Sequence, residues 1–288
     1  MSERILSMQR EEAIIKLLDD ESPLVEKALT AELKAHEEAG VTLLRRILRS
    51  NEKLLASRAK LYLERVVGPN TAEEFSRFIK SLQYELETGM LLLNRVVTPT
   101  LQASHIWPHV DGLARRCREL IVEPITPFEK IKIINRVLFH ENGFRGDVDN
   151  YEDPLNSFVE PVLRRRKGIP ITLSIIYLMV SRRINFELEP IGMPGRFLVA
   201  SFHDGNALYI DPFERGQIRT AEEVREILRS NQIFPEEMYM MPTPVGEVLC
   251  RCCRNLVRQY TAKNNPSKAK LFAGFVREFE ETHKQAES

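Results

Sequence analysis

The segment from Gly168 to Gly216 constrains the fold of this chain more than any other part of it. Gly168 ends a basic run, and Pro170 follows where a helix would start, a position at which proline's missing N–H costs nothing. The residues after Pro170 are apolar on nearly every side until Arg182, which is typical of a helix buried inside a domain. The sequence therefore predicts a buried helix that begins at Pro170.

Short runs rich in β-branched and aromatic residues follow this helix. They cover residues 186–191, 197–202 and 207–211, and turn signals at 192–195 and 203–206 separate them. Strands joined by such short turns pair in antiparallel fashion, and a helix packed on a small antiparallel sheet makes an α+β core. We therefore expect an α+β fold that is mainly α-helical.

Helical periodicity dominates the chain before this core. Apolar residues recur every three or four positions over residues 8–18, 23–37, 40–49, 52–67 and 71–93. Residues 1–70 resemble HEAT-type helical hairpins, but helices that merely extend the core's own helical layer would give the same pattern. If these helices are HEAT-like, the surface they offer is one for proteins.

A capped helix is expected at residues 220–230, and a helical hairpin that turns at 264–266 is expected at the end of the chain. A single hairpin cannot bury its own apolar face, so it should dock on the core or on a partner. The predicted organisation is therefore an N-terminal helical region at 1–70, a core at 71–241 and a C-terminal hairpin at 242–288.

Several ordered motifs resemble the transglutaminase-like superfamily and, more closely, its bacterial SirB-type subfamily. They are Glu87-x-Gly89, Phe139-x-x-x-Gly143-Phe144-x-Gly146, Tyr151-x-x-Pro154-x-Asn156-Ser157, Arg166-x-Gly168-Ile169-Pro170-Ile171-x-Leu173-Ser174, Pro194-Gly195-x-Phe197-Leu198 and Ile210-Asp211-Pro212-Phe213. The matching region covers roughly residues 80–240, and several motifs in order are more specific than any one alone. The resemblance implies a papain-like or transglutaminase-like core, with a C-terminal hairpin that is a remnant of tetratricopeptide-like helices.

The same resemblance implies that the catalytic triad is degenerate. Pro170 stands at the position of the nucleophilic cysteine, and Arg196 stands at the position of the histidine base. A proline has no nucleophilic atom, and a guanidinium cannot accept a proton at ordinary pH. Asp211 remains at the position of the acid that would orient the imidazole. We expect Asp211 and Arg196 to form an ion pair across adjacent strands.

These residues predict a catalytically inactive protein that binds a protein or peptide, or acts as a regulatory module. The predicted ligand-binding residues are Glu87, Asn156, Arg196 and Asp211, with Arg196 placed to hold a carboxylate. One alternative is a hydrolase or acyltransferase with a non-cysteine nucleophile in the same pocket, and another is a regulatory assembly factor. The hydroxyl and imidazole groups near the core that bear on the first alternative belong to Ser157, Thr172, Ser174, Thr220 and His203.

Composition excludes several other classes of function. The chain has 41 basic and 41 acidic residues, and this balance argues against a nucleic-acid partner. It has no long uninterrupted apolar run and no signal-like start, so we expect a cytoplasmic protein without a membrane partner. The sparse cysteines and the acidic residues 147–153 lack the spacing of a metal site, so we expect no metal and no cofactor.

Overall fold

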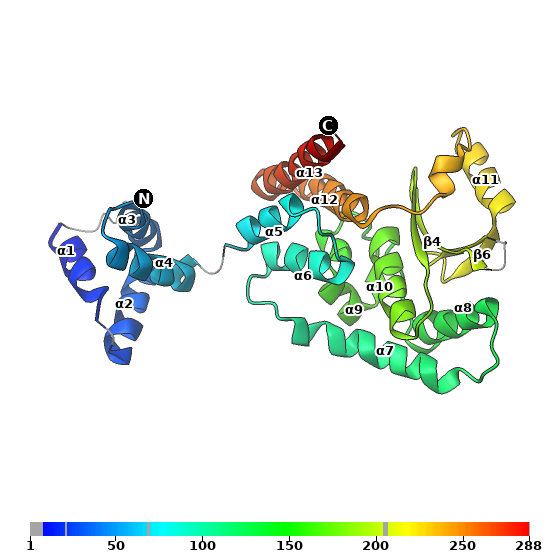
Figure 1. The fold of residues 1–288 in the computed structure, drawn as a ribbon, viewed down its shortest axis with the longest axis horizontal. Helices are drawn as coiled ribbons and strands as arrows, with labels where there is room; N and C mark the ends of the chain where they lie inside the picture. Colours follow the sequence, from blue (N-terminus) through cyan, green and yellow to red (C-terminus); the bar gives the residue numbers. More distant parts are fainter. Residues whose placement is uncertain (1–7, 21, 68–69, 204–206, 288) are drawn as a thin grey trace. The chain divides into compact units, whose positions relative to one another are not determined.

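The computed structural model describes residues 8–20, 22–67, 70–203 and 207–287, and the chain divides into two compact units, Met1–Glu73 and Glu74–Ser288 (Figure 1). The helices of the first unit are α1 (Met8–Leu17), α2 (Pro23–Ala35), α3 (Glu37–Leu48) and α4 (Lys53–Val67). Leu33, Leu44 and Ala59 are fully buried among them, so the first unit has a hydrophobic core of its own.

The second unit contains most of the helices and every described strand. Helix α5 (Thr71–Lys80) begins just before the boundary and lies mostly in this unit. The helices wholly within it are α6 (Leu86–Val97), α7 (Trp107–Leu120), α8 (Pro127–Asn135), α9 (Val159–Arg165), α10 (Pro170–Arg183), α11 (Ala221–Ser230), α12 (Val245–Ala262) and α13 (Pro266–Glu287). Short turns of 3₁₀ helix are η1 (Ala103–His105), η3 (Pro154–Ser157) and η5 (Glu237–Met240), and η2 (Arg136–Glu141) is a π-helical turn. The strands are β1 (Arg145–Gly146), β2 (Lys167–Gly168), β3 (Glu189–Met193), β4 (Arg196–Ser201), β5 (Leu208–Asp211) and β6 (Gln217–Thr220).

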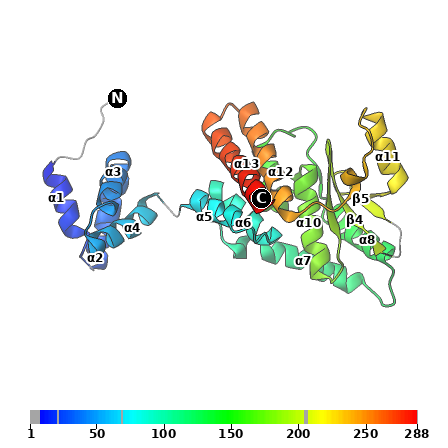
Figure 2. The same ribbon diagram turned by 45° about the horizontal axis from the view of Figure 1, so that its top comes forward.

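Helix α10 and one antiparallel sheet form the centre of this unit. The helix begins at Pro170, as the sequence predicts, and every residue from 171 to 181 is buried. The sheet has the strand order β3-β4-β5-β6. Helix α10 covers one face of the sheet and α11 lies on the other (Figure 2). Val224 and Leu228 of α11 pack against Leu198 and Tyr209, so the sheet is buried on both faces. The molecule is therefore mainly helical with a small antiparallel sheet.

The structure corrects the expected elements in some places. The helix expected at residues 71–93 is two helices, α5 and α6, because the chain turns between them and Leu82 has a φ of 56°. Strand β6 extends the sheet beyond the expected strands, and β1 and β2 form a separate two-residue parallel ladder. Of the turn expected at 203–206, residues 204–206 lie outside the described part of the chain.

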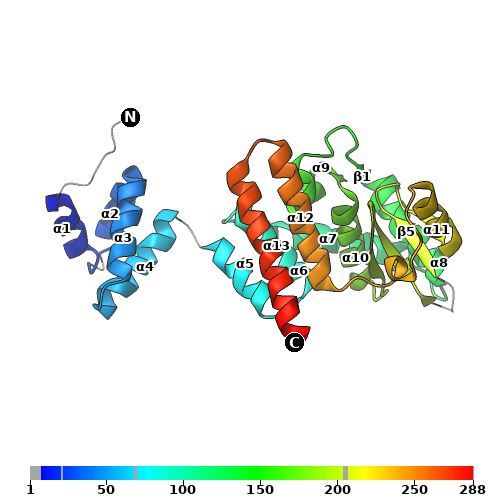
Figure 3. The same ribbon diagram turned by 90° about the horizontal axis from the view of Figure 1, so that it is seen from above.

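Helices α12 and α13 lie side by side and belong to the second unit (Figure 3). The rings of Tyr260 and Phe272 stack between them with their centroids 5.6 Å apart. Helix α12 also packs on α6 and α10, which buries Cys252 and Leu256 completely. Among the described residues, no helix combines the length and the apolar composition needed to cross a bilayer.

Candidate functional site

The three triad-equivalent positions meet at one pocket at the start of α10. The pocket has a volume of about 310 Å³. The residues that line it come from the loop before η3, the start of α10 and the turns at the ends of β4 and β5. They are Tyr151, Pro170, Gly195, Arg196, Phe197, Asp211, Phe213 and Glu214. The fold therefore brings Pro170, Arg196 and Asp211 together, although they are distant in sequence.

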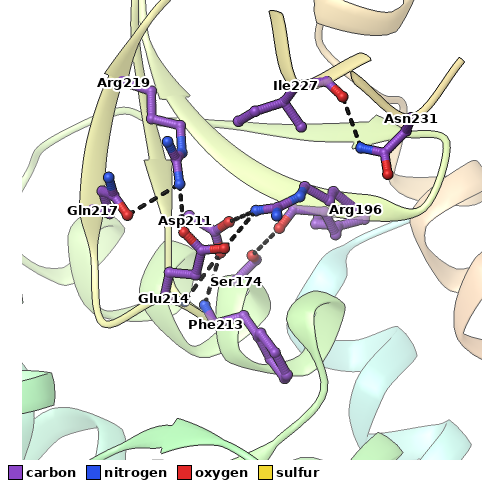
Figure 4. A network of polar contacts seen from close by, with 10 residues as sticks. Ser174, Arg196, Asp211, Phe213, Glu214, Gln217, Arg219, Ile227 and Asn231 are labelled. Atoms are coloured by element: carbon purple, nitrogen blue, oxygen red, sulfur yellow. Dashed lines mark hydrogen bonds and ion pairs between the residues drawn. The ribbon is translucent and has the colours of Figure 1, made fainter. Parts of the chain in front are cut away.

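Arg196 holds two carboxylates with one nitrogen. Its Nη1 donates to Asp211 Oδ2 and to Glu214 Oε1, each at 2.8 Å. The other oxygen of Glu214 accepts from Arg219 of β6, so the charges alternate along the series Asp211, Arg196, Glu214, Arg219 (Figure 4). The expected ion pair between Asp211 and Arg196 is confirmed. Glu214 and Arg219 extend it into a network.

Register explains how Arg196 reaches Asp211. Val199 pairs with Ile210 across β4 and β5, so the two charged residues are diagonal neighbours near the ends of these strands. Diagonal neighbours across antiparallel strands lie within reach of long side chains such as arginine. The ion pair is thus a consequence of the sheet's geometry.

The second oxygen of Asp211 holds the turn that follows β5. Oδ1 accepts from the backbone N–H groups of Phe213 at 3.0 Å and Glu214 at 3.2 Å. The backbone oxygen of Asp211 accepts from Gly216 N at 2.8 Å, and Asn135 Nδ2 donates to Gly216 O at 2.7 Å. Both oxygens of the carboxylate are therefore occupied by backbone and arginine donors, and an imidazole is not among them.

Burial and charge shift the ionisation of this network in opposite directions. Burial, with the nearby charge of Glu214, raises the pKa of Asp211 above its ordinary value even though Arg196 opposes the shift. Burial would also raise the pKa of Glu214, but the bonds from Arg196 and Arg219 outweigh it and lower that pKa. Burial by itself would lower the pKa of Arg196, and the bonds and charges of Glu214 and Asp211 raise it. Arg196 therefore stays protonated and cannot act as a base.

Pro170 supplies the pocket with an apolar wall where a thiol would stand. Ile169 is the N-cap of α10, and no side chain accepts a hydrogen bond at this helix start. The chain's cysteines, Cys117, Cys250, Cys252 and Cys253, are all buried elsewhere in the second unit. Burial raises the pKa of the thiols of Cys117, Cys250 and Cys252 to about 12, and it also raises that of Cys253. None of these thiols is an activated nucleophile.

The hydroxyl groups near the start of α10 serve packing. Ser174 donates to Phe197 O at 3.2 Å, which ties α10 to β4. Ser157 donates to Gln259 Oε1 of α12 at 2.7 Å. The Oγ1 of Thr172 is buried and makes no hydrogen bond within the described part of the chain. These hydroxyls are absent from the residues that line the pocket, as far as the chain is described.

One hydroxyl does contact an imidazole, but outside this pocket. Ser201 Oγ lies 2.9 Å from His203 Nδ1. The pair lines a separate, open hollow of about 760 Å³ together with Thr220 and the first residues of α8 and α11. The Ser201 side chain is held in the sheet, with the residue 2% exposed. The pocket at Arg196 and the hydroxyl–imidazole contact are thus two different places in the fold.

The structure does not bring Asn156 or Glu87 to the pocket. Asn156 is fully buried, where it accepts from Arg165 Nη2 at 2.8 Å and donates to Asp147 Oδ2 at 3.2 Å. Glu87 accepts from Nη2 of Arg183 at 2.9 Å. Arg183 is the last residue of α10, about 20 Å along the helix axis from Pro170. Both residues stabilise the scaffold and do not line the site.

Sequence reasoning missed Glu214, Arg219 and the aromatic side chains of Tyr151 and Phe213. Glu214 is an acid three residues after Asp211, in the turn that ends at Gly216, and this placement was the signal that could have predicted it. Arg219 lies on the unexpected strand β6, so no expected pairing led to it. Tyr151 is the first residue of the motif that ends at Ser157. The sequence of that motif does not indicate which of its side chains lines the pocket.

Helix α12 supports two walls of the pocket. Arg251 Nη2 donates to Met193 O at 2.7 Å and Arg196 O at 2.8 Å, which fixes the turn between β3 and β4. The guanidinium of Arg258 lies 5.3 Å from the centroid of the Tyr151 ring. The C-terminal helices therefore help to shape the site.

Comparison with known proteins identifies the family of this chain. A family model described as the transglutaminase-like superfamily matches residues 105–254. The chain is 33% identical over 194 residues to a UPF0162 protein of Xylella fastidiosa, which covers 64% of this chain and 68% of the relative. A UPF0162 protein of Vibrio cholerae is 34% identical over 186 residues, 61% of this chain and 67% of that protein.

A eukaryotic relative carries only part of this region. The F-box only protein 21 of Mus musculus is 32% identical over 117 residues, which is 38% of this chain and 19% of that protein. No solved structure shows significant similarity to this chain. The chain belongs to the transglutaminase-like superfamily, within the SirB-like group of UPF0162 proteins.

Proposed function

We propose that this protein is a catalytically inactive member of its superfamily that binds a protein or peptide through the Arg196 pocket. The observation that supports this proposal most is the ion-pair network at the triad positions. An arginine held by two carboxylates, Asp211 and Glu214, stands at the position that the resemblance assigns to the imidazole, and Pro170 lines the same pocket at the position of the thiol.

The network leaves Arg196 with donors for a ligand. Both carboxylates bond to Nη1, and Nε and Nη2 make no hydrogen bond within the described part of the chain. The side chain is 32% exposed at the pocket, beside the aromatic rings of Tyr151, Phe197 and Phe213. A guanidinium with free N–H groups suits a carboxylate, and aromatic walls suit the apolar part of a peptide. The ligand we propose is therefore a peptide segment that ends in or carries a carboxylate.

Arg196→Ala is expected to weaken partner capture more than it weakens the fold. The matched control is Arg219→Gln, which breaks the same network at Glu214 but leaves the pocket lining intact. The measurement pairs quantitative capture from native lysate with urea unfolding of the wild type and both variants. We expect capture by Arg196→Ala to fall about tenfold, and capture by Arg219→Gln to stay within about twofold. Equal losses of capture in the two variants would reduce Arg196 to a structural member of the network.

The alternative function is a hydrolase or acyltransferase with a non-cysteine nucleophile, which was expected in the same pocket. The contact between Ser201 and His203 favours such an enzyme, but with its nucleophile in the separate hollow. A serine next to an imidazole is the arrangement of an activated hydroxyl. The binding proposal expects no labelling of Ser201 by a fluorophosphonate probe. Labelling that disappears in Ser201→Ala would favour the enzyme.

A further inference from the structure

The segment between α11 and α12, residues 231–244, contacts the edge strand β3 of the sheet. Thr243 N donates to Pro190 O, and Thr243 Oγ1 accepts from Gly192 N, both at 2.8 Å. Met240 is 5% exposed in the cluster between the sheet and α11, and its carbonyl accepts from the hydroxyl of Tyr209. The last part of this segment, from Met240 to Thr243, is thus hydrogen-bonded to the sheet.

The same segment presents large apolar side chains to solvent. Phe234 is 79% exposed, Met238 is 68% exposed and Met241 is 59% exposed. Met238 lies in η5 and Met241 directly follows it, and Met241 N donates to Met238 O at 3.4 Å, so one tight turn brings the two methionines together. Exposed apolar groups that are clustered, rather than scattered singly, mark interaction sites.

Carboxylates without partners accompany these side chains. Glu236 and Glu237 lie between Phe234 and Met238 in sequence, and both are exposed. Glu189, on the neighbouring strand β3, is exposed as well. None of the three takes part in an ion pair or side-chain hydrogen bond within the described residues. Glu222 and Glu247, on α11 and α12, are by contrast paired with arginines.

We propose that this methionine surface, formed by Phe234, Met238 and Met241 with Glu236 and Glu237, binds a basic amphipathic segment of a partner protein. Methionine side chains adapt to different apolar partners because they are unbranched and polarizable. The unpaired carboxylates select for lysine and arginine beside the apolar residues of that segment. The surface lies outside the Arg196 pocket, so the proposal holds whether or not that pocket binds a ligand.

The test uses the full chain and a fluorescent amphipathic peptide made of leucine and lysine, with a leucine and glutamate peptide of the same pattern as the charge control. Fluorescence anisotropy measures binding to the wild type, to Met238→Ser with Met241→Ser, and to Glu236→Gln with Glu237→Gln. Val122→Ser is the matched control, because Val122 is 77% exposed and lies elsewhere on the unit. Arg196→Ala is included to separate this surface from the pocket.

We expect the methionine variant to bind the lysine peptide about tenfold more weakly than the wild type. The glutamine variant should bind about threefold more weakly and lose most of its dependence on salt. Val122→Ser and Arg196→Ala should bind the lysine peptide, amidated at its C-terminus, as the wild type does. Binding of the glutamate peptide, which the Arg196 pocket could take up, should be lost in Arg196→Ala and unchanged in the methionine variant. Equal loss in Val122→Ser, glutamate-peptide binding that depends on Met238 and Met241, or methionine-dependent self-association in place of peptide binding would overturn the proposal.

Discussion

Glu214 links the two arginines of the candidate site through its two carboxylate oxygens. It takes one arginine from β4 and another from β6, and this pairing keeps it ionised beside the buried Asp211. Asp211, at the position that would orient an imidazole, instead binds Arg196 and the backbone of the turn after β5. A single substitution that restored the histidine would therefore leave Glu214 and Arg219 to be rearranged as well.

Glu214→Gln is expected to destabilise the protein in a pH-dependent way. A carboxylate whose pKa is lowered by folding stabilises the fold above its ordinary pKa, and that contribution disappears as the pH falls through the lowered value. We expect a loss of about 1 kcal/mol near pH 7, discounted for partial exposure, and almost none once the pH is well below the lowered pKa. Urea unfolding across this range measures it, with the exposed Glu187→Gln as control. A loss that stayed constant with pH would contradict the account.

At the scale of elements, the predictable parts were those with local signals. The glycine and proline before α10 and its apolar sequence were enough to predict a buried helix, and Thr220 with Glu223 forms the capping box expected at α11. Strand β6 was missed because its sequence, Gln-Ile-Arg-Thr, is short and only partly buried. The break between α5 and α6 depends on the positive φ at Leu82, which no glycine marks.

In the candidate site, too, only the residues with a signal in the sequence could be predicted. Three positions came from motif order, and the pairing of strands then supplied the ion pair. Asn156 and Glu87 were misplaced because a shared motif does not distinguish a residue that lines a pocket from one that supports the scaffold. Their roles depend on Arg165 and Arg183, partners that only the tertiary structure identifies.

We expect the shape of the Arg196 pocket to depend on helix α12. Arg251→Met removes both bonds from a guanidinium to the turn between β3 and β4. We expect a loss of roughly 2–3 kcal/mol in the free energy of unfolding, together with weaker capture through Arg196. Arg254→Met, which breaks only exposed ion pairs on the same helix, should cost less than about 1 kcal/mol. A similar loss in both variants would show that Arg251 does not position the turn.

At the scale of the whole molecule, each compact unit has its own buried core. Leu44 is fully buried in the first unit, and the rest of its cluster belongs to that unit as well. Leu44→Ala should therefore destabilise the first unit by about 2–5 kcal/mol and leave the second unit unchanged. Calorimetry should resolve two transitions, of which only one shifts. A single transition that moves as a whole would mean that the units unfold together.

The central claim is that the pocket formed by Pro170, Arg196 and Asp211 binds without catalysing a reaction. The most direct measurement is the rate of amide hydrolysis and acyl transfer on glutamine-containing peptides, with the wild type, Arg196→Ala and Asp211→Asn side by side. The account predicts rates equal to those of buffer alone for all three proteins. Turnover by the wild type that is lost in either folded variant would contradict it.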